Sequence, residues 1–217
     1  MSIFSQEIYQ LTSLALSELD ASQTTGRTMH NALSEAHYLG AWVTTAIKKK
    51  RFDPIVLETL KSWQKKARSL GKNAGLKEQF IYLQKCYDQV LDEKKASRAL
   101  NIEQFNALYA TLTEQQWLVT TDLEVVDKLN RHSDGKDSLI VCATQITNCF
   151  DEQGELIKPI SLYVRGNQQT IINLAFAQNI LLHKQTDYKS KVKYHGEFIV
   201  YPHNDGNFLP ELPKEAN

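Results

Sequence analysis

The feature that most restricts the fold is a run of seventeen residues, 166–182, without a charged side chain. It predicts a helix over 168–183, joined to a preceding strand by the link Arg165-Gly166-Asn167. Apolar side chains would point almost all round this helix, so we expect several of its faces to be buried. A small sheet covers only one face. We therefore predict that the helix lies between a C-terminal sheet and a helical N-terminal half, and that the two halves share a core.

The first half of the sequence predicts a helical bundle over residues 1–115. Apolar side chains recur there every three or four residues, the spacing that places them along one face of a helix. The clearest stretch puts Val56, Leu60 and Trp63 on one such face. Helices with a single apolar stripe bury those stripes against one another. The predicted helices cover residues 5–19, 28–50, 55–70, 76–92 and 102–112.

The second half changes its pattern and predicts an α+β region over residues 116–202. Residues 138–149 are rich in β-branched side chains, and a turn sequence leads from them into 155–165, as in a β-hairpin. Residues 191–201 predict a last strand, and 203–217 are expected to form a flexible tail. The fold class is therefore α+β, with the helical bundle packed on a small antiparallel or mixed sheet that holds the buried helix.

The stretch between the two halves allows two element orders. Two capping-box patterns, Thr113-x-x-Gln116 and Thr121-x-x-Glu124, occur in it, and the second predicts a helix over 122–131. If residues 116–121 form a strand, the order from there onward is ferredoxin-like. If they form a helix, the order is winged-helix-like. The first order is a β-α-β-β-α-β unit, and the second places three helices before a wing.

The overall composition favours a soluble, cytoplasmic protein. Lys and Arg number 25 and Asp and Glu also 25, so no net field draws the chain to a membrane or to nucleic acid. No apolar run approaches the roughly 20 residues that cross a bilayer. Three cysteines without scaffold spacing suggest reduced thiols. The six histidines lack the tight spacing of a zinc site, so we expect no metal and no cofactor.

A row of basic side chains forms the first candidate site. Residues 48–98 hold 14 basic and 6 acidic residues, and within them four cations recur along one face of the predicted helix 55–70 and just beyond it. These are Lys61, Lys65, Arg68 and Lys72. Such a row can neutralise phosphates, so nucleic-acid binding through 48–72 is one expectation. The alternative is an ordinary solvated face, because a surface helix needs charge opposite its apolar stripe.

DNA recognition by a winged helix is disfavoured by charge. The helix that would enter the major groove, 122–131, carries Asp122, Glu124 and Asp127. An acidic helix is repelled on approach to the phosphates.

The link at Arg165 is the second candidate site. A strand end followed by a helix N-terminus offers free amides to an anion, and Arg165 could add a fork of donors. A single glycine does not make a phosphate cradle, so the alternative is a turn in which Gly166 adopts positive φ.

Catalysis is not indicated by any motif. Cys86 and Cys142 lie in apolar patterns typical of buried thiols, and Cys149 precedes a turn where it could be exposed. No pattern supplies an activating partner for a nucleophile. We therefore expect a non-enzymatic interaction protein, an adaptor or subunit of a larger assembly, with protein partners. The alternatives are a nucleic-acid-binding protein using 48–72, and an enzyme or binder of a phosphorylated ligand near Arg165.

Overall fold

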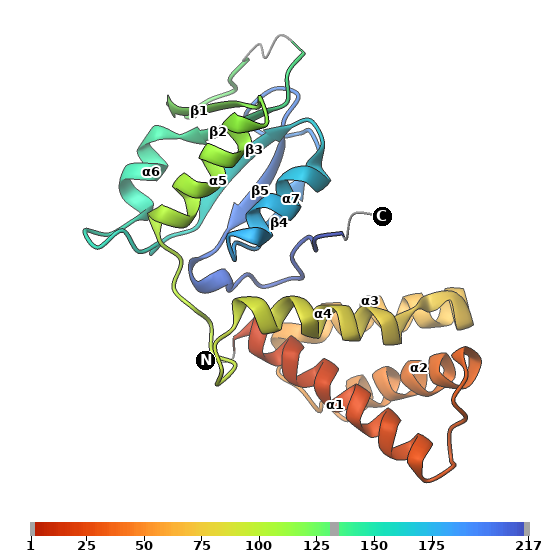
Figure 1. Cartoon of the computed structure of the whole chain (residues 1–217). Helices are drawn as coiled ribbons and strands as arrows, with labels where there is room; N and C mark the ends of the chain where they lie inside the picture. Colours follow the sequence, from red (N-terminus) through yellow and green to blue (C-terminus); the bar gives the residue numbers. More distant parts are fainter. Residues whose placement is uncertain (1–2, 131–134, 215–217) are drawn as a thin grey trace. The chain divides into compact units, whose positions relative to one another are not determined.

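The computed structural model describes residues 3–130 and 135–214 and divides into two compact units, Met1–Ala96 and Ser97–Asn217 (Figure 1). Helices dominate the first unit, and a five-stranded mixed sheet forms the centre of the second. The predicted α+β class is confirmed. Within the described residues, no helix is long and apolar enough to span a bilayer.

The first unit is helical, as its apolar periodicity predicted. Its elements are α1 (Phe4–Thr24), α2 (Ala32–Lys48), η1 (Pro54–Val56), α3 (Leu57–Leu70), η2 (Gly71–Ala74) and α4 (Leu76–Val90). In this unit α1 packs against α4 and α2 against α3. The predicted helix 28–50 begins later, because Asn31 caps it by accepting a hydrogen bond from the Ser34 amide. Met29 consequently lies outside the helix and is 72% exposed.

The stripes of these helices form a buried core. Trp63 and Phe80 pack with their ring centroids 4.7 Å apart. Trp42 is 5% exposed and Trp117, in the second unit, 6%. All three tryptophans are therefore core residues, and none is available as a surface anchor for a partner.

The second unit packs helices α5 (Ile102–Glu114), α6 (Ala143–Cys149) and α7 (Gln168–Ala177) into one main core with its sheet. Its strands are β1 (Leu118–Leu123), β2 (Ser138–Cys142), β3 (Ile160–Arg165), β4 (His183–Thr186) and β5 (Gly196–Val200), and η3 (Pro202–Asn204) follows them. The sheet order is β1-β2-β3-β5-β4. Only the β1–β2 pair is parallel, and the other neighbours are antiparallel.

The two faces of this sheet belong to different clusters. On β2, Leu139 and Val141 pack into the main core with residues of α5 and α7, whereas Ile140 and Cys142 face the other side. This alternation follows from the two-residue period of a strand. The second side holds a smaller cluster with Val125 and Val192, which lie outside the regular elements.

The predicted helix 122–131 is wrong. Residues up to Leu123 continue strand β1, and 124–130 form no helix; residue 131 lies outside the described residues. The capping-box pattern misled because Glu124 instead accepts a short hydrogen bond from Thr144 Oγ1, 2.5 Å away. Both the ferredoxin-like and the winged-helix-like orders needed that helix, so neither describes the sheet.

The predicted strand 138–149 is correct only in its first part. Its chain leaves the sheet after Cys142 and continues as α6, so β2 and β3 are antiparallel neighbours joined through a helix rather than through a tight hairpin. Residues Phe150 and Leu156 make an isolated bridge around the turn.

The uncharged run is divided between a helix and an extended segment. Helix α7 ends at Ala177, and Asn179, with φ of 60°, turns the chain before Ile180–Leu182 lead into β4. Ile171 and Ile172 are buried from the helix, and Ile180 from the extended part. A helical wheel over 168–183 therefore overstated how many faces the helix buries. The shared core of the two halves stays a prediction.

The described residues of the expected tail pack on the second unit. Leu182 and Glu211 form a bridge, and the Lys214 amide donates to Asn173 Oδ1 at 2.9 Å. Residues 203–214 are therefore bound along α7 and β4, while 215–217 lie outside the described residues.

Candidate ligand-binding pocket

The predicted basic row is exposed on the first unit. Lys61, Lys65 and Arg68 lie on the outer face of α3, and Lys72 follows in η2. Lys61 Nζ forms an ion pair with Glu58, 2.7 Å away on the same helix. Among the described residues of this unit no aromatic side chain is exposed, so no ring accompanies the row. Its role in nucleic-acid binding stays a prediction.

The loop at Arg165 is engaged by the protein itself. Gly166 has φ of 125°, and a Cβ placed there would lie 2.2 Å from Asp137 Cγ. The Asn167 amide donates to Asp137 Oδ2 at 3.3 Å. A carboxylate thus occupies the position that an anion would take. Arg165 itself extends over the ring of Tyr194, with 6.0 Å between Cζ and the ring centroid.

The start of α7 is capped from within as well. Asn167 Oδ1 accepts hydrogen bonds from the amides of Gln169 and Thr170, at 3.0 and 3.3 Å. These are donors that a helix N-terminus would otherwise offer to a ligand. The structure therefore gives this loop the geometry of a capped connection.

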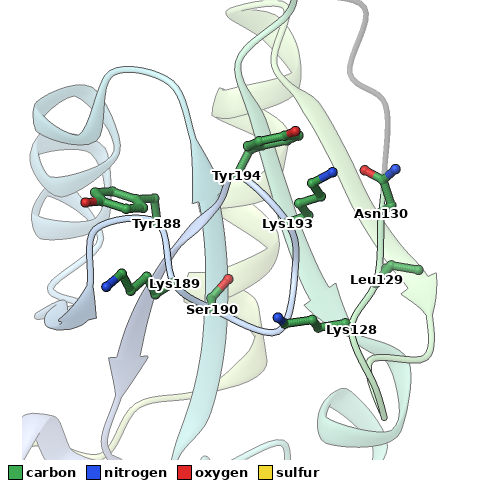
Figure 2. Close-up of a pocket in the computed structure, with 8 residues that line it drawn as sticks. All are labelled: Lys128, Leu129, Asn130, Tyr188, Lys189, Ser190, Lys193 and Tyr194. Atoms are coloured by element: carbon green, nitrogen blue, oxygen red, sulfur yellow. The ribbon is translucent and has the colours of Figure 1, made fainter.

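A cavity of about 520 Å³ is lined in part by Tyr194, the residue whose ring Arg165 approaches, and lies on the side of the sheet opposite α5 and α7 (Figure 2). Two separate segments line it, one before the undescribed residues 131–134 and one before strand β5. The lining residues are Lys128, Leu129, Asn130, Tyr188, Lys189, Ser190, Lys193 and Tyr194. We call it the tyrosine–lysine pocket.

Backbone pairing holds the two segments together. Leu129 and Val192 form a parallel bridge, in which the Leu129 amide donates to the Lys191 carbonyl at 2.9 Å. The Lys193 amide returns a hydrogen bond of 2.8 Å to the Leu129 carbonyl. Val192 is completely buried in the smaller core cluster, with Leu129 packed beside it. A buried apolar contact thus anchors the two lining segments.

His195 fixes the end of the 188–194 segment. It is fully buried, with Nε2 2.9 Å from Ser138 Oγ and Nδ1 2.9 Å from the Lys193 carbonyl. Burial lowers the pKa of His195 and so favours the neutral ring, in which Nδ1–H donates to the Lys193 carbonyl and Nε2 accepts from the Ser138 hydroxyl. Tyr194, directly before it, has φ of 65°, a conformation uncommon for a bulky residue. Its ring remains 59% exposed.

Positive charge dominates the lining. Lys128, Lys189 and Lys193 form no ion pair with the part of the chain that the structure describes. Lys193 Nζ lies 4.7 Å from the centroid of the Tyr194 ring, within the range of a cation–π contact. No carboxylate is among the lining residues described. Such a wall attracts anions.

Aromatic side chains gather at the same place. Of all the aromatic residues in the described ranges, only Tyr188 and Tyr194 are exposed, at 66% and 59%. Both line the pocket. Figure 2 shows their rings apart from each other and the Lys193 side chain next to Tyr194. A flat exposed ring beside an ammonium suits a ligand that carries both an aromatic base and a phosphate.

The histidines and cysteines of the described residues do not line the pocket. All three cysteines are buried, Cys149 included, and burial raises the pKa of Cys86 to about 11. The described residues contain no cluster of metal ligands, and His132 lies outside them. The pocket can therefore bind by charge and stacking.

The lining residues were not predicted from the sequence, although a signal for them is present there. Residues 184–195 contain four lysines and two tyrosines but a single acid, Asp187. Basic residues interleaved with aromatic ones are the pattern sought for single-stranded nucleic acid. The contribution of Lys128 could not be found this way, because it reaches the pocket only through the Leu129–Val192 bridge.

Residues 3–213 match the family DUF2913, described as "Protein of unknown function", and the chain belongs to that family. No curated protein and no solved structure matches the chain.

Proposed function

We propose that this member of the DUF2913 family is a non-enzymatic binding protein that holds a phosphate-bearing ligand in its tyrosine–lysine pocket. The observation that supports the proposal most is the coincidence of three unpaired lysines with both exposed tyrosines in one cavity. Lysine binds phosphate as a point charge, and tyrosine supplies a stacking face. The three reduced thiols are consistent with a cytoplasmic location, which is part of the proposal.

Chemical-shift mapping with thymidine monophosphate tests this function directly. The nucleotide carries one phosphate and one base, so it can contact a lysine and a tyrosine together. We expect amide shifts in 128–130 and 188–194, weakened by salt because the contacts are ionic. Shifts confined to other residues would contradict the proposal.

A matched pair of variants separates the pocket from general positive charge. The double variant Lys189→Ala/Lys193→Ala removes two pocket cations, and Lys61→Ala/Lys65→Ala removes two exposed cations of α3. The first should weaken binding of the nucleotide about tenfold or more, since hydrogen bonds to charged groups contribute about 1.5–3 kcal/mol. The second should leave binding unchanged. Equal losses of nucleotide affinity in both double variants would show that general positive charge attracts the nucleotide and that the pocket is not a specific site.

An adaptor role is the second candidate, favoured by a groove of about 200 Å³ in the first unit. Small residues of α2 and α3 form it, and Arg68 and Lys72 of the basic row line it together with Leu33. Leu33 is 64% exposed, which is a large apolar exposure beside two cations. An acidic protein segment with an apolar anchor would match this groove in charge and shape.

Copurification from the native cell tests the adaptor role. A specific partner should be lost from Leu33→Ser and from Arg68→Glu, and kept by Lys61→Ala, which alters the same face away from the groove. Retention of the partner by all three variants would remove this groove from consideration.

A further inference from the structure

We infer that the ligand of the tyrosine–lysine pocket is an unpaired nucleic-acid strand, rather than a mononucleotide or a duplex. The inference rests on the proposed function and adds the class of ligand. It follows from the number of stacking rings, the placement of the cations and the absence of a helix from the described lining.

Two separate rings call for two bases. Tyr188 and Tyr194 are both exposed and lie six residues apart on one segment, and in Figure 2 their rings stand at different positions on the pocket wall. A single base has two faces and could use both rings only if they faced each other across it, whereas Figure 2 shows the two rings standing apart. A strand presents consecutive unstacked bases, each worth about 1–3 kcal/mol on an aromatic side chain. Both rings are used only if the ligand is at least a dinucleotide.

The cations are placed to follow a backbone. Lys128 comes from one segment, and Lys189 and Lys193 come from the other. In Figure 2, Lys189 lies at the left of the pocket and Lys128 and Lys193 lie at its right, so positive charge is present on both sides. Arg165 adds a guanidinium near Tyr194. The single acid of 184–195, Asp187, is already paired with Lys184 at 3.0 Å. A chain of phosphates crossing the cavity would meet successive cations and no free carboxylate of this segment.

A duplex fits the same surface poorly. Its bases are stacked on one another, so neither tyrosine could reach a base face. The major groove of DNA is read by a helix or a two-stranded ribbon that enters it. The described lining segments, 128–130 and 188–194, contain no helix and only the isolated Leu129–Val192 bridge. Stacking on unpaired bases is what this surface offers.

Fluorescence anisotropy with a labelled oligothymidylate of about 12 nucleotides, a length within the range of known single-strand sites, tests the inference. Tyr188→Ala and Tyr194→Ala should each weaken binding by about 5- to 150-fold, the equivalent of one lost stacked base. Tyr188→Phe and Tyr194→Phe keep the ring and should restore most of the affinity. Circular dichroism of each variant confirms that the fold is retained.

Salt dependence gives an independent measurement. Each pocket lysine that contacts a phosphate should lower the slope of log affinity against log salt by about 0.7 when replaced by Ala, the value for single strands. The prediction applies to Lys128→Ala, Lys189→Ala and Lys193→Ala. Lys158→Ala, which removes an exposed cation of the second unit outside the pocket, is the matched control and should leave the slope unchanged.

The outcomes separate this inference from the proposed function. If thymidine monophosphate, or a duplex of the same length, competes as well per molecule as the oligothymidylate, the strand inference is overturned and the proposed function stands. If no phosphate-bearing probe binds, or if the tyrosine and lysine variants bind the oligothymidylate like the wild type, both are overturned.

Discussion

His183 should make the second unit sensitive to acid. Its ring is 1% exposed and packs edge-on against Tyr201 and Phe208, with centroids 5.0 and 5.3 Å away. The backbone approaches so closely that a Cβ on Gly206 would lie 2.3 Å from His183 Nε2. Burial lowers the pKa of His183 from 6.5 to about 4, because the charged ring would lose its hydration there.

The sign and size of the effect follow from that difference in pKa. Above pH 6.5 the ring is neutral in both states, and its contribution to stability is complete. As the pH falls, His183 is protonated in the unfolded chain but stays neutral in the folded chain. Stability is therefore lost between about pH 6.5 and about pH 4. The loss reaches about 2 kcal/mol at about pH 5 and about 3 kcal/mol in full.

Urea unfolding of the wild type and of His183→Gln, measured between about pH 7 and about pH 5, tests this reasoning. Gln does not titrate, so the variant should lose about 2 kcal/mol less than the wild type over that range. The matched control His37→Gln changes an exposed histidine of α2 and should keep the wild-type dependence. Parallel curves for the wild type and His183→Gln would show that the buried ring does not govern the acid response.

Three further perturbations test the fold. Phe105→Ala should lower the free energy of unfolding by about 3–5 kcal/mol in urea, because this ring is fully buried in the main core of the second unit. Gly166→Ala should cost about 1–3 kcal/mol in the same assay, since it combines positive φ with a clash at Asp137. A fragment of residues 97–217 should unfold cooperatively by circular dichroism, whereas 116–217, which lacks α5, should aggregate. Aggregation of the longer fragment would instead support a core shared by the two halves.

The regular helices were predictable because their burial is one-sided. The stretch 55–70 became α3 and 76–92 became α4, each within about two residues at its ends. In both, one apolar stripe faces the core and the remaining surface is polar, so the period of the sequence reflects the period of the helix. Local pattern and tertiary environment agree in these elements.

The prediction was wrong where tertiary contacts override local preference. Residues 143–149 contain Ile and Thr, which favour strands, yet they form α6 against β1, β2 and β3. Thr121-x-x-Glu124 has the letters of a capping box, but its Glu is bound to Thr144. The pocket was equally out of reach, because Leu129 and Val192 lie far apart in the sequence and meet only in the folded chain.

The conformation of Tyr194 sets stability against binding. With φ of 65° its backbone is in the left-handed region, which glycine adopts without strain. A bulky residue in this region lowers the free energy of unfolding by about 1–3 kcal/mol. Replacing Tyr194 by Gly would relieve that cost and also remove one of the two exposed rings. A search for heat-resistant variants would therefore select Gly at this position. It would remove the ring, and an assay of stability alone would not detect the loss of binding. Stabilising substitutions in this protein should therefore leave Tyr194 unchanged and be placed in the helical unit.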